Sequence, residues 1–369
     1  MKVVTVVGTR PELIRLARVI ARLEESVDHV LVHTGQNWDY RLNGIFFEDL
    51  GLRMPDHVLD VDTSSLGATL GDVLRKTEAV LAAERPDAFL VLGDTNSAVS
   101  AVMAKRMRIP TYHMEAGNRC FDENVPEETN RRLVDHVADF NLVYTEHARR
   151  NLLAEGLHPR RLLLTGSPMR EVLEHYRPQI DASTVLDDRG LAPEGYVLVS
   201  AHREENVDRP ARLAQLVECL RGVHDRFGLP VLVSTHPRTA KRLDELGVSD
   251  LDGIEFAPPF GFHDYNKLQM NAFCVLSDSG TISEESSLLR FPAVTLRSSI
   301  ERPEALDTGS IIMTDLREQS VLDGIAAARA DFAATEVPRD YQIADTSIRV
   351  RNFILSTAFE HARWAGIRE

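Results

Sequence analysis

The sequence predicts an α/β protein that contains two doubly wound parallel sheets. Short apolar runs, typical of buried strands, alternate with stretches of helical period from one end of the chain to the other. Polar residues gather directly after these runs, at the strand ends where open α/β sheets bind ligands. The chain has 369 residues, of which 43% are hydrophobic, and this is enough for two cores of domain size.

The strand-like runs fall into two halves of the chain. They cover residues 3–7, 30–34, 88–92, 110–114, 139–144 and 162–165 in the first half, and 196–200, 231–235, 254–257, 271–276, 293–296 and 310–313 in the second. The stretch 167–193 interrupts the alternation with a polar helix, Pro178 and an Asp-Asp-Arg-Gly segment. We therefore expect an N-terminal domain of residues 1–170 and a C-terminal domain of residues 171–345. Residues 348–364 read as a closing helix, with Val350, Phe353, Ile354 and Phe359 on its apolar side.

Composition excludes several classes of protein. The net charge of −14 argues against nucleic acid or an anionic membrane as the main partner. The three cysteines, Cys120, Cys219 and Cys274, fit neither a disulfide framework nor a zinc site, which favours a reducing cytoplasm. The chain starts with a strand and contains no apolar stretch of membrane-spanning length, so we expect neither a signal peptide nor a membrane span.

Two strand-to-helix turns are suited to an anionic ligand. In the first, Gly8 follows a buried strand, and Thr9 and Glu12 have the spacing of a capping box, with Arg10 between them. In the second, Ser279 and Gly280 lie where a helix begins and leaves N–H groups unpaired. Arg10 and this second helix are therefore expected to hold a phosphorylated ligand from two domains. The alternative for either turn alone is an ordinary strand-to-helix connection.

Seven motifs carry a resemblance to a known family. They are VVGTRPELIRL, VLGDTNSA, MEAGNRCFDENVPEETNRR, SAHREEN, STHPR, DSGTISEE and ERPEAL. In order and spacing they resemble the non-hydrolysing UDP-N-acetylglucosamine 2-epimerase family, and the wording is most similar to the branch that makes UDP-N-acetyl-L-fucosamine. The resemblance implies a GT-B architecture of two Rossmann-like domains with an interdomain cleft, and a C-terminal segment, about residues 346–369, that packs back on the first domain. It also implies a UDP-sugar ligand and a homodimer.

The implied reaction can be argued from chemistry. The hydrogen on C2 of a hexosamine lies next to no carbonyl group, so its direct removal and return would be too slow. If a base removes this proton while UDP leaves C1, a glycal forms, and UDP adds back after reprotonation from the opposite face. Carboxylates for proton transfer and cations for the diphosphate suffice, so no metal or other cofactor is expected.

The resemblance places the acid and base among Asp94, Glu115 and Glu127, without deciding which acts on which face. Taken alone, Asp94 has the alternative of a helix N-cap, and Glu127 and Glu128 that of a solvated loop. His202 matches the family's active-site histidine, although an isolated histidine is more often structural.

The remaining candidate residues are assigned to the nucleotide and its sugar. Arg131 matches a family arginine, and its spacing also suits a pair with Glu127 on one helical face. The resemblance assigns the diphosphate to Ser279 and Gly280 and the ribose to Glu285. Thr281 replaces a second glycine, and Arg15 replaces a lysine. The other candidates are Arg10, Arg203, His236 and Arg302.

His113, Met114 and Cys120 lie near Glu115 in the sequence but are not assigned to the site. His113 and Met114 are explained by strand packing, and Cys120 lacks a partner that would activate its thiol.

Gln36 is followed by Asn37 and Trp38, where many bacterial members have a Gln-His pair that binds an activating UDP-sugar, so we expect hyperbolic kinetics.

Three functions other than UDP-N-acetylglucosamine epimerisation remain open on the sequence. The first is epimerisation of a UDP-2-acetamido-2,6-dideoxy-L-hexose. The second is glycosyl transfer on the same fold, which would share Glu285 and the helix terminus but need an acceptor site. The third is a non-catalytic UDP-sugar sensor, which would have no reason to keep Asp94, Glu115, Glu127 and His202 together.

Overall fold

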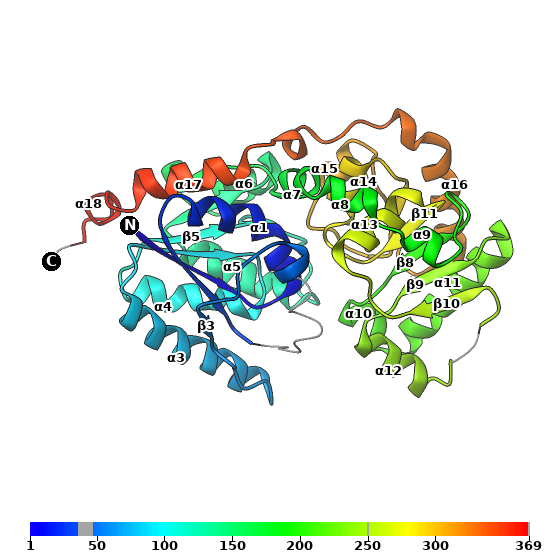
Figure 1. The fold of residues 1–369 in the computed structure, drawn as a ribbon, viewed down its shortest axis with the longest axis horizontal. Coiled ribbons are helices and arrows are strands. Elements are labelled where there is room, and N and C mark those ends of the chain that lie inside the picture. The colour runs from blue at the N-terminus through cyan, green and yellow to red at the C-terminus, as the bar shows by residue number, and fades with distance from the viewer. Residues whose placement is uncertain (36–46, 249–250, 368–369) are drawn as a thin grey trace. The chain divides into compact units, whose positions relative to one another are not determined.

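The computed structural model describes residues 1–35, 47–248 and 251–367. The chain forms two compact units (Figure 1). The first consists of Met1–Glu174 together with Arg339–Glu369, and the second of His175–Pro338. Each unit contains one parallel sheet with helices on both faces, so the predicted α/β fold with two doubly wound sheets is confirmed.

The described part of the first unit contains a seven-stranded sheet with the order β3-β2-β1-β4-β5-β6-β7, and all its pairs are parallel. Its strands are β1 (Lys2–Val7), β2 (Asp28–His33), β3 (His57–Val58), β4 (Ala88–Leu92), β5 (Thr111–Met114), β6 (Phe140–Val143) and β7 (Leu162–Leu164). Its helices are α1 (Arg10–Glu24), α3 (Leu66–Glu84), η1 (Asn96–Ser100), α4 (Ala101–Arg106), α5 (Glu127–Val137), α6 (Glu146–Ala154), η2 (Pro159–Arg161), α7 (Met169–His175), η4 (Arg339–Gln342), α17 (Thr346–Thr357) and α18 (His361–Ala365).

The second unit repeats this design with the order β10-β9-β8-β11-β12-β13. Its strands are β8 (Val197–Ser200), β9 (Val231–Ser234), β10 (Ile254–Ala257), β11 (Cys274–Ser277), β12 (Ala293–Thr295) and β13 (Ile312–Met313). Its helices are α8 (Arg177–Ala182), α9 (Val185–Asp188), α10 (Glu204–Val207), α11 (Pro210–Phe227), α12 (Pro237–Glu245), α13 (Phe262–Asn271), α14 (Ile282–Leu289), α15 (Glu304–Asp307), α16 (Glu318–Asp331) and η3 (Phe332–Ala334).

In both units the strand order reverses next to the first strand. This reversal separates the connections that follow β1 and β4 in the first unit, and those that follow β8 and β11 in the second. Open α/β sheets bind ligands in the crevice at such a point, outside the carboxyl ends of the strands. The candidate residues Arg10, Asp94, His202 and Ser279 all lie there.

Alternating apolar side chains explain how the sheets are covered. In the first unit Val4, Val6, Phe89 and Val91 share one core with residues of α3, α4 and α5. In Figure 1, α1 and α17 lie together over the other face. In the second unit one core joins β8, β9, β11 and β12 to α11 and α16.

The C-terminal segment is bonded to the first unit. The hydroxyl of Thr346, at the start of α17, donates to the carbonyl oxygen of Thr165 at 3.0 Å. Near the end of the same helix, the Thr357 hydroxyl lies 2.7 Å from the Tyr112 hydroxyl of β5. The chain therefore returns to its first sheet after completing the second.

Three details differ from the prediction. The strand expected from residue 271 begins at Cys274, because α13 continues through Asn271, whose side-chain amide donates to the Lys267 carbonyl. The predicted closing helix is two helices, because α17 ends at Thr357. Phe359 therefore falls out of phase and is 67% exposed, so it was wrong to place it on the apolar side. The two-residue strand β3 was not predicted.

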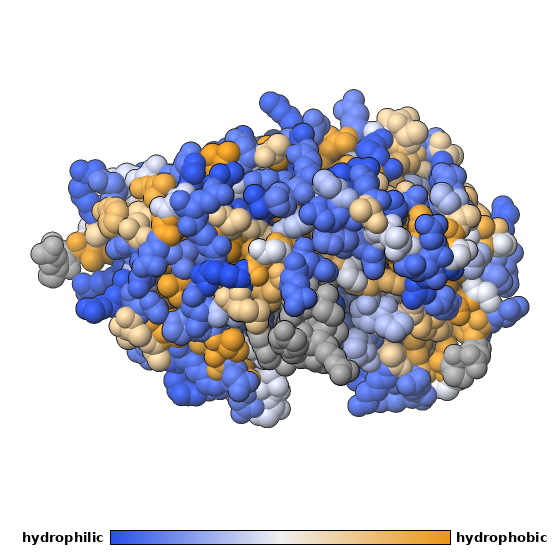
Figure 2. Space-filling view, viewed as in Figure 1, coloured by the Kyte–Doolittle hydropathy of each residue, from blue (hydrophilic) through white to orange (hydrophobic). Residues whose placement is uncertain are grey.

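Hydrophilic residues predominate on the face seen in Figure 2, where apolar residues are scattered among them. No helix in the described ranges combines the length and the apolar character that crossing a bilayer requires.

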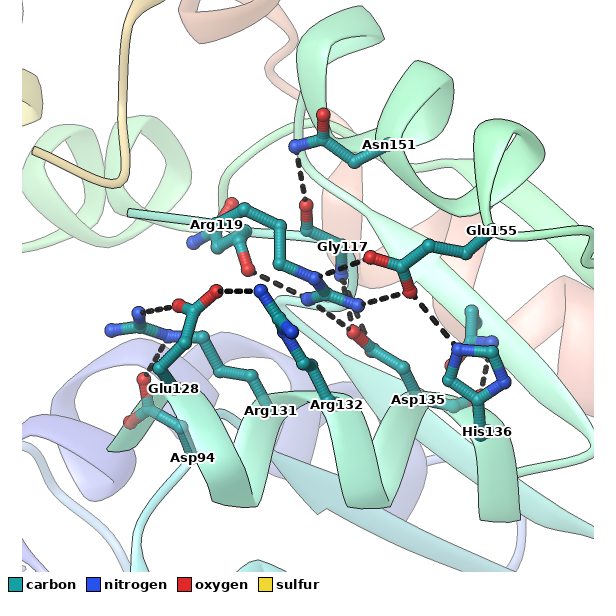
Figure 3. A network of polar contacts seen from close by, with 12 residues as sticks. Asp94, Gly117, Arg119, Glu128, Arg131, Arg132, Asp135, His136, Asn151 and Glu155 are labelled. Atoms are coloured by element: carbon teal, nitrogen blue, oxygen red, sulfur yellow. Dashed lines mark hydrogen bonds and ion pairs between the residues drawn. The ribbon is translucent and has the colours of Figure 1, made fainter. Parts of the chain in front are cut away.

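Helix α5 is fixed to its surroundings by ion pairs (Figure 3). The guanidinium of Arg119, in the connection after β5, donates to Asp135 of α5 at 2.7 Å and forms a fork with Glu155, which follows α6. His136 of α5 lies 3.0 Å from the second oxygen of the same Glu155 carboxylate. Hydrogen bonding to Arg119 holds the pKa of Glu155 below its ordinary value. These contacts join α5, α6 and the connection after β5 into one rigid corner.

The return of the C-terminal segment is expected to stabilise the first unit. Ile354 is fully buried on α17, whereas the adjacent Leu355 is 42% exposed. Replacing Ile354 by Ala should lower the free energy of unfolding by about 2–5 kcal/mol, because it leaves a cavity. The matched change Leu355→Ala should cost no more than about 0.5 kcal/mol. Urea unfolding of the full chain, followed by circular dichroism, measures both, and equal effects would contradict the packing described here.

The Glu155 ion pairs should make stability depend on pH in the acid range. Because the pKa of Glu155 is lowered on folding, its contribution is present above the unfolded value of about 4.3 and is lost as pH falls through the lower folded value. The wild type should therefore be more stable than Glu155→Gln at neutral pH, and this difference should shrink below about pH 4. Unfolding measured from pH 7 to 3 tests this, with Glu78→Gln on the exposed side of α3 as the control.

Candidate active site

Asp94 follows β4 and is held by an arginine of α5. Its Oδ2 atom accepts from Nε of Arg131 at 2.7 Å, and its side chain is 24% exposed. The side-chain amide of Asn130 donates to the Asp94 carbonyl oxygen at 2.9 Å. The alternative of a helix N-cap is wrong, because the cap position of η1 is occupied by Thr95. The Asp94 carboxylate is therefore oriented by a cation and not used by a helix end.

Glu115 follows β5 and leaves the sheet beside Asp94, because Leu92 and Met114 are partners in the β4/β5 register. Its carboxylate is buried and forms an ion pair with Arg15 of α1. Its φ angle of 64° lies in the left-handed region, which is costly for a residue with a Cβ atom. Such strain persists only where the surroundings enforce it, and it is concentrated at functional sites.

Glu127 is the first residue of α5 and is half-buried. The next residue, Glu128, is buried, so the alternative of a solvated loop is wrong for it. Arg131 donates from Nη1 to Glu128 at 2.9 Å, whereas the spacing argument had named Glu127 as its partner. Burial would raise the pKa of Glu128, but hydrogen bonds from Cys120 and Arg131 outweigh burial and hold it below the ordinary value. Burial raises the pKa of the Cys120 thiol, which disfavours the thiolate.

Glu12 has a larger role than the predicted capping box. Its carboxylate is buried and accepts from the backbone N–H groups of Gly8 and Thr9 and from the Ser97 hydroxyl. Burial raises the pKa of Glu12, and these hydrogen bonds oppose the increase. The connections after β1 and β4 are thus tied together through one side chain. The clue to this role in the sequence was the place of Glu12 on the apolar face of α1.

Arg10 and Arg15 lie on the same helix in different surroundings. Arg10, the first residue of α1, is half-buried, and burial lowers the pKa of its guanidinium. Arg15 is buried beside Glu115. Gln36, Asn37 and Trp38, where the family's Gln-His pair is replaced, lie outside the described part of the chain.

In the second unit, Asp278 organises two neighbouring strand ends. It is fully buried and accepts from the backbone N–H groups of His202 and Arg203 at 3.0–3.1 Å. Ring atom Nδ1 of His202 lies 3.3 Å from Asp278 Oδ1, while 46% of the His202 side chain is exposed. The histidine is therefore held at its Nδ1 side and open to a ligand on the rest of its ring. The sequence prediction did not give Asp278 this role.

The turn before α14 is lined by paired arginines, which we call the guanidinium cluster: Arg203, Arg297 and Arg302 with their partners Glu284 and Glu301. Arg203 donates to Glu301 at 3.2 Å, and Arg297 donates to the other oxygen of the same carboxylate. A Cβ atom added to Gly280 would lie 2.7 Å from the Glu301 carboxylate, so that side chain would have to shift. Arg297 was missed by sequence reasoning, although it follows β12 at the same edge of the sheet.

The other predicted nucleotide residues have local partners. Arg302 forms an ion pair with Glu284, which is fully buried in the first turn of α14. Glu285 accepts from the Gln269 amide at 2.7 Å. The hydroxyls of Ser279 and Thr281 lie 2.9 Å apart, and Thr281 takes the N-cap position of α14. His236 is the N-cap of α12, where its Nδ1 atom accepts from the Arg238 N–H at 3.2 Å.

The candidate residues thus form two sets, one in each unit. Arg10, Arg15, Asp94, Glu115, Glu127 and Arg131 belong to the first unit, and His202, Arg203, His236, Ser279, Gly280, Thr281, Glu285 and Arg302 belong to the second. In the ranges that the structure describes, no three His, Cys, Asp or Glu side chains are grouped as a metal site would require.

Comparison with known proteins identifies the family. The model of the family described as UDP-N-acetylglucosamine 2-epimerase matches residues 21–355. A UDP-N-acetylglucosamine 2-epimerase from Rickettsia bellii has a similar structure, with 43% identity, a TM-score of 0.92 and coverage of 100% of both chains. The Methanocaldococcus jannaschii enzyme, solved in complex with UDP-GlcNAc and UDP, shows 31% identity and a TM-score of 0.91 over 96% of this chain and 100% of that one.

A relative with another substrate belongs to the same group. The UDP-2,3-diacetamido-2,3-dideoxy-D-glucuronate 2-epimerase of Pseudomonas aeruginosa is 32% identical over 341 residues, which is 91% of this chain and 93% of that protein. The family model spans most of the chain, and these similarities extend over nearly its whole length. The chain therefore belongs to the UDP-N-acetylglucosamine 2-epimerase family and is an isomerase with the two-domain fold of that family.

Proposed function

We propose that this chain inverts C2 of UDP-N-acetylglucosamine by eliminating UDP to a glycal and adding it back. The observation that carries the mechanism is the pair of carboxylates at the ends of β4 and β5. Asp94 and Glu115 leave neighbouring strands at one edge of the sheet, and each faces its own arginine, Arg131 and Arg15. A nearby cation favours the ionised form of a carboxylate, and an ionised carboxylate is what a base requires.

The reaction balances without a further reactant. One carboxylate takes the C2 proton, the C1–O bond to UDP breaks, and the released electron pair forms the C1=C2 double bond. In the return step a carboxylic acid protonates C2 from the other face while a UDP oxygen forms the bond to C1. Glu127, half-buried at the start of α5, is the third candidate for these transfers.

We assign the leaving diphosphate to the guanidinium cluster and the turn before α14. The cluster brings three arginines to this turn, where they pair with Glu284, Glu301 and Glu205. Guanidinium groups bind phosphate oxygens through paired N–H donors. The N–H groups before α14 and the positive end of its dipole favour the same ligand. The proposal gives His202 and Arg203 contact with the departing diphosphate, Ser279, Gly280, Thr281 and Arg302 the bound one, and Glu285 the ribose. The proposal also assigns Arg10 and His236 to the nucleotide.

The identity of the hexosamine is the finer part of the proposal. The second candidate is a UDP-2-acetamido-2,6-dideoxy-L-hexose, which the resemblance of the sequence motifs favours. Arg15, which pairs with Glu115, presents a larger planar head than a lysine beside this carboxylate. A panel of UDP-hexosamines without acceptor, followed by proton NMR, ranks these substrates. Turnover without acceptor also excludes a glycosyltransferase and a sensor.

We further propose that the enzyme acts as a homodimer in the cytoplasm. The three free cysteines support a reducing compartment. Sedimentation of the reduced protein tests the dimer, and cell fractionation tests the compartment.

Solvent hydrogen should enter the product. Epimerisation of UDP-N-acetylglucosamine in deuterated water, with no added metal or nicotinamide, should give product with deuterium at C2, because the abstracted proton exchanges with solvent before the opposite face is protonated. Mass spectrometry and proton NMR of the product measure this. Full turnover with C2 unlabelled would rule out proton transfer through exchangeable carboxylates.

Neutralising the carboxylates should remove most of the activity. Asp94→Asn, Glu115→Gln and Glu127→Gln should each lower kcat by roughly 10²-fold or more, because general acid–base catalysis contributes on this order. Glu123→Gln, an exposed acid in the same connection, is the matched control and should keep normal activity. If all three variants turn over normally while remaining folded, the assignment of the site is wrong.

A further inference from the structure

His113 contacts the backbone at the end of β4 and a buried carboxylate of α5. It belongs to β5, two residues before Glu115, and is 1% exposed. Its Nε2 atom lies 2.7 Å from the carbonyl oxygen of Gly93, the residue before Asp94. Its Nδ1 atom lies 2.9 Å from Asp135 Oδ1 on α5. Strand packing alone, which the sequence suggested for this residue, does not account for two polar contacts inside a core.

Asp135 links His113 to the backbone that follows β5. Its carboxylate is fully buried and accepts from the backbone N–H of Gly117 at 3.2 Å. Nη1 of Arg119 donates to the same carboxylate at 2.7 Å, as Figure 3 shows. Since Gly117 lies two residues after Glu115, the His113–Asp135 pair joins the backbone beside Asp94 to the backbone beside Glu115.

The partners of His113 determine its protonation state. A backbone carbonyl can only accept, so the Nε2 atom carries a hydrogen. Asp135 accepts from Arg119 and Gly117, an arrangement suited to a carboxylate, and a hydrogen on Nδ1 would complete its contacts. A ring with both nitrogens protonated is an imidazolium cation, and this state of His113 is part of the proposal.

Charge balance is compatible with a charged His113. The charged groups that face the pair are Arg119, from the connection after β5, and Glu155, which follows α6 and is also contacted by the half-exposed His136. A charged His113 and Arg119 balance Asp135 and Glu155 to zero. The Glu155 side chain is 27% exposed, so water shares in balancing its charge.

The backbone at both contact points has φ angles that other contacts must hold in place. Gly93 and Gly117 have φ angles of 74° and 82°, and Glu115 itself has one of 64°. A Cβ atom at Gly117 would collide with the Ala148 carbonyl, so the chain passes close beneath α6. Hydrogen bonds to Gly93 and Gly117 hold these turns in a conformation that free backbone seldom adopts.

We propose that cationic His113 and Asp135 are a positioning pair that sets the separation and orientation of Asp94 and Glu115 for proton transfer at C2. This role rests on the proposed function. It predicts that the pair acts on the chemical step and not on nucleotide binding, because neither residue belongs to the guanidinium cluster or the turn before α14.

The first test needs no activity. Nitrogen NMR of the histidine-labelled full-length protein, with His113→Gln used to assign the signal, should show both His113 ring nitrogens protonated at the assay pH. A neutral ring, with one protonated and one bare nitrogen, would overturn the charge assignment and with it the proposal.

The second test separates positioning from folding. His113→Gln and Asp135→Asn should each lower kcat by about 10- to 100-fold, because small displacements of reacting groups have effects of this order. The KM for the UDP-sugar and the Kd for UDP should stay within about twofold, since uniform binding is not altered. His136→Gln, which changes a histidine of the same helix at the exposed edge of the network, should keep the wild-type kcat.

The double variant His113→Gln/Asp135→Asn keeps the buried charges balanced, because Arg119 and Glu155 remain. It should regain thermal stability relative to the single variants while its kcat stays low. If kcat instead recovers in step with stability, or if folded single variants keep kcat within twofold of wild type, the positioning role is overturned. A wild type inactive on every UDP-hexosamine overturns the proposed function and this role together, whereas an active wild type with unaffected variants overturns this role alone.

Discussion

The carboxyl ends of β4 and β5 depend on the ion pairs of α5. Glu128, Arg131 and Asp135 recur on one side of this helix, and each is buried. Arg131 holds Asp94, Glu128 holds the backbone N–H of Cys120, and Asp135 holds that of Gly117. Buried ion pairs are weak sources of net stability because desolvation costs nearly as much as the pairing returns. What they provide here is geometry, since each is satisfied by one arrangement of the strand ends.

This arrangement explains why charged side chains occur inside the first unit. Buried charges are tolerated when each has a partner, and the chain supplies those partners from different elements: Arg15 from α1, Arg131 from α5 and Arg119 from the connection after β5. Glu12 serves the same purpose for the connections after β1 and β4 with uncharged donors. The strand ends are therefore rigid before any ligand arrives, which lowers the cost of aligning reacting groups.

The second unit holds its charged residues in place in a different way. Asp278 uses backbone donors to fix His202 and Arg203, while the guanidinium cluster shares two glutamates among three arginines. Guanidinium donors at a glycine turn before a helix suit an anion. A protein with a net charge of −14 can hold a diphosphate only through such local concentration of cations.

The sequence by itself determined the fold class, the order of strands and helices, the positions of the candidate residues after the strands, and the family. These follow from local periodicity and from motifs, both of which are properties of neighbouring residues. The ends of helices were predicted less well than their order, as at Asn271 and Phe359, because an apolar run does not show where packing ends. Only the tertiary structure decided the partners: Glu128 instead of Glu127 for Arg131, Glu12 for Ser97, and Asp135 for His113. Some of these pairs are separated by 22 or 85 residues and meet because parallel strands end at one edge of a sheet, so no local pattern in the chain could name them.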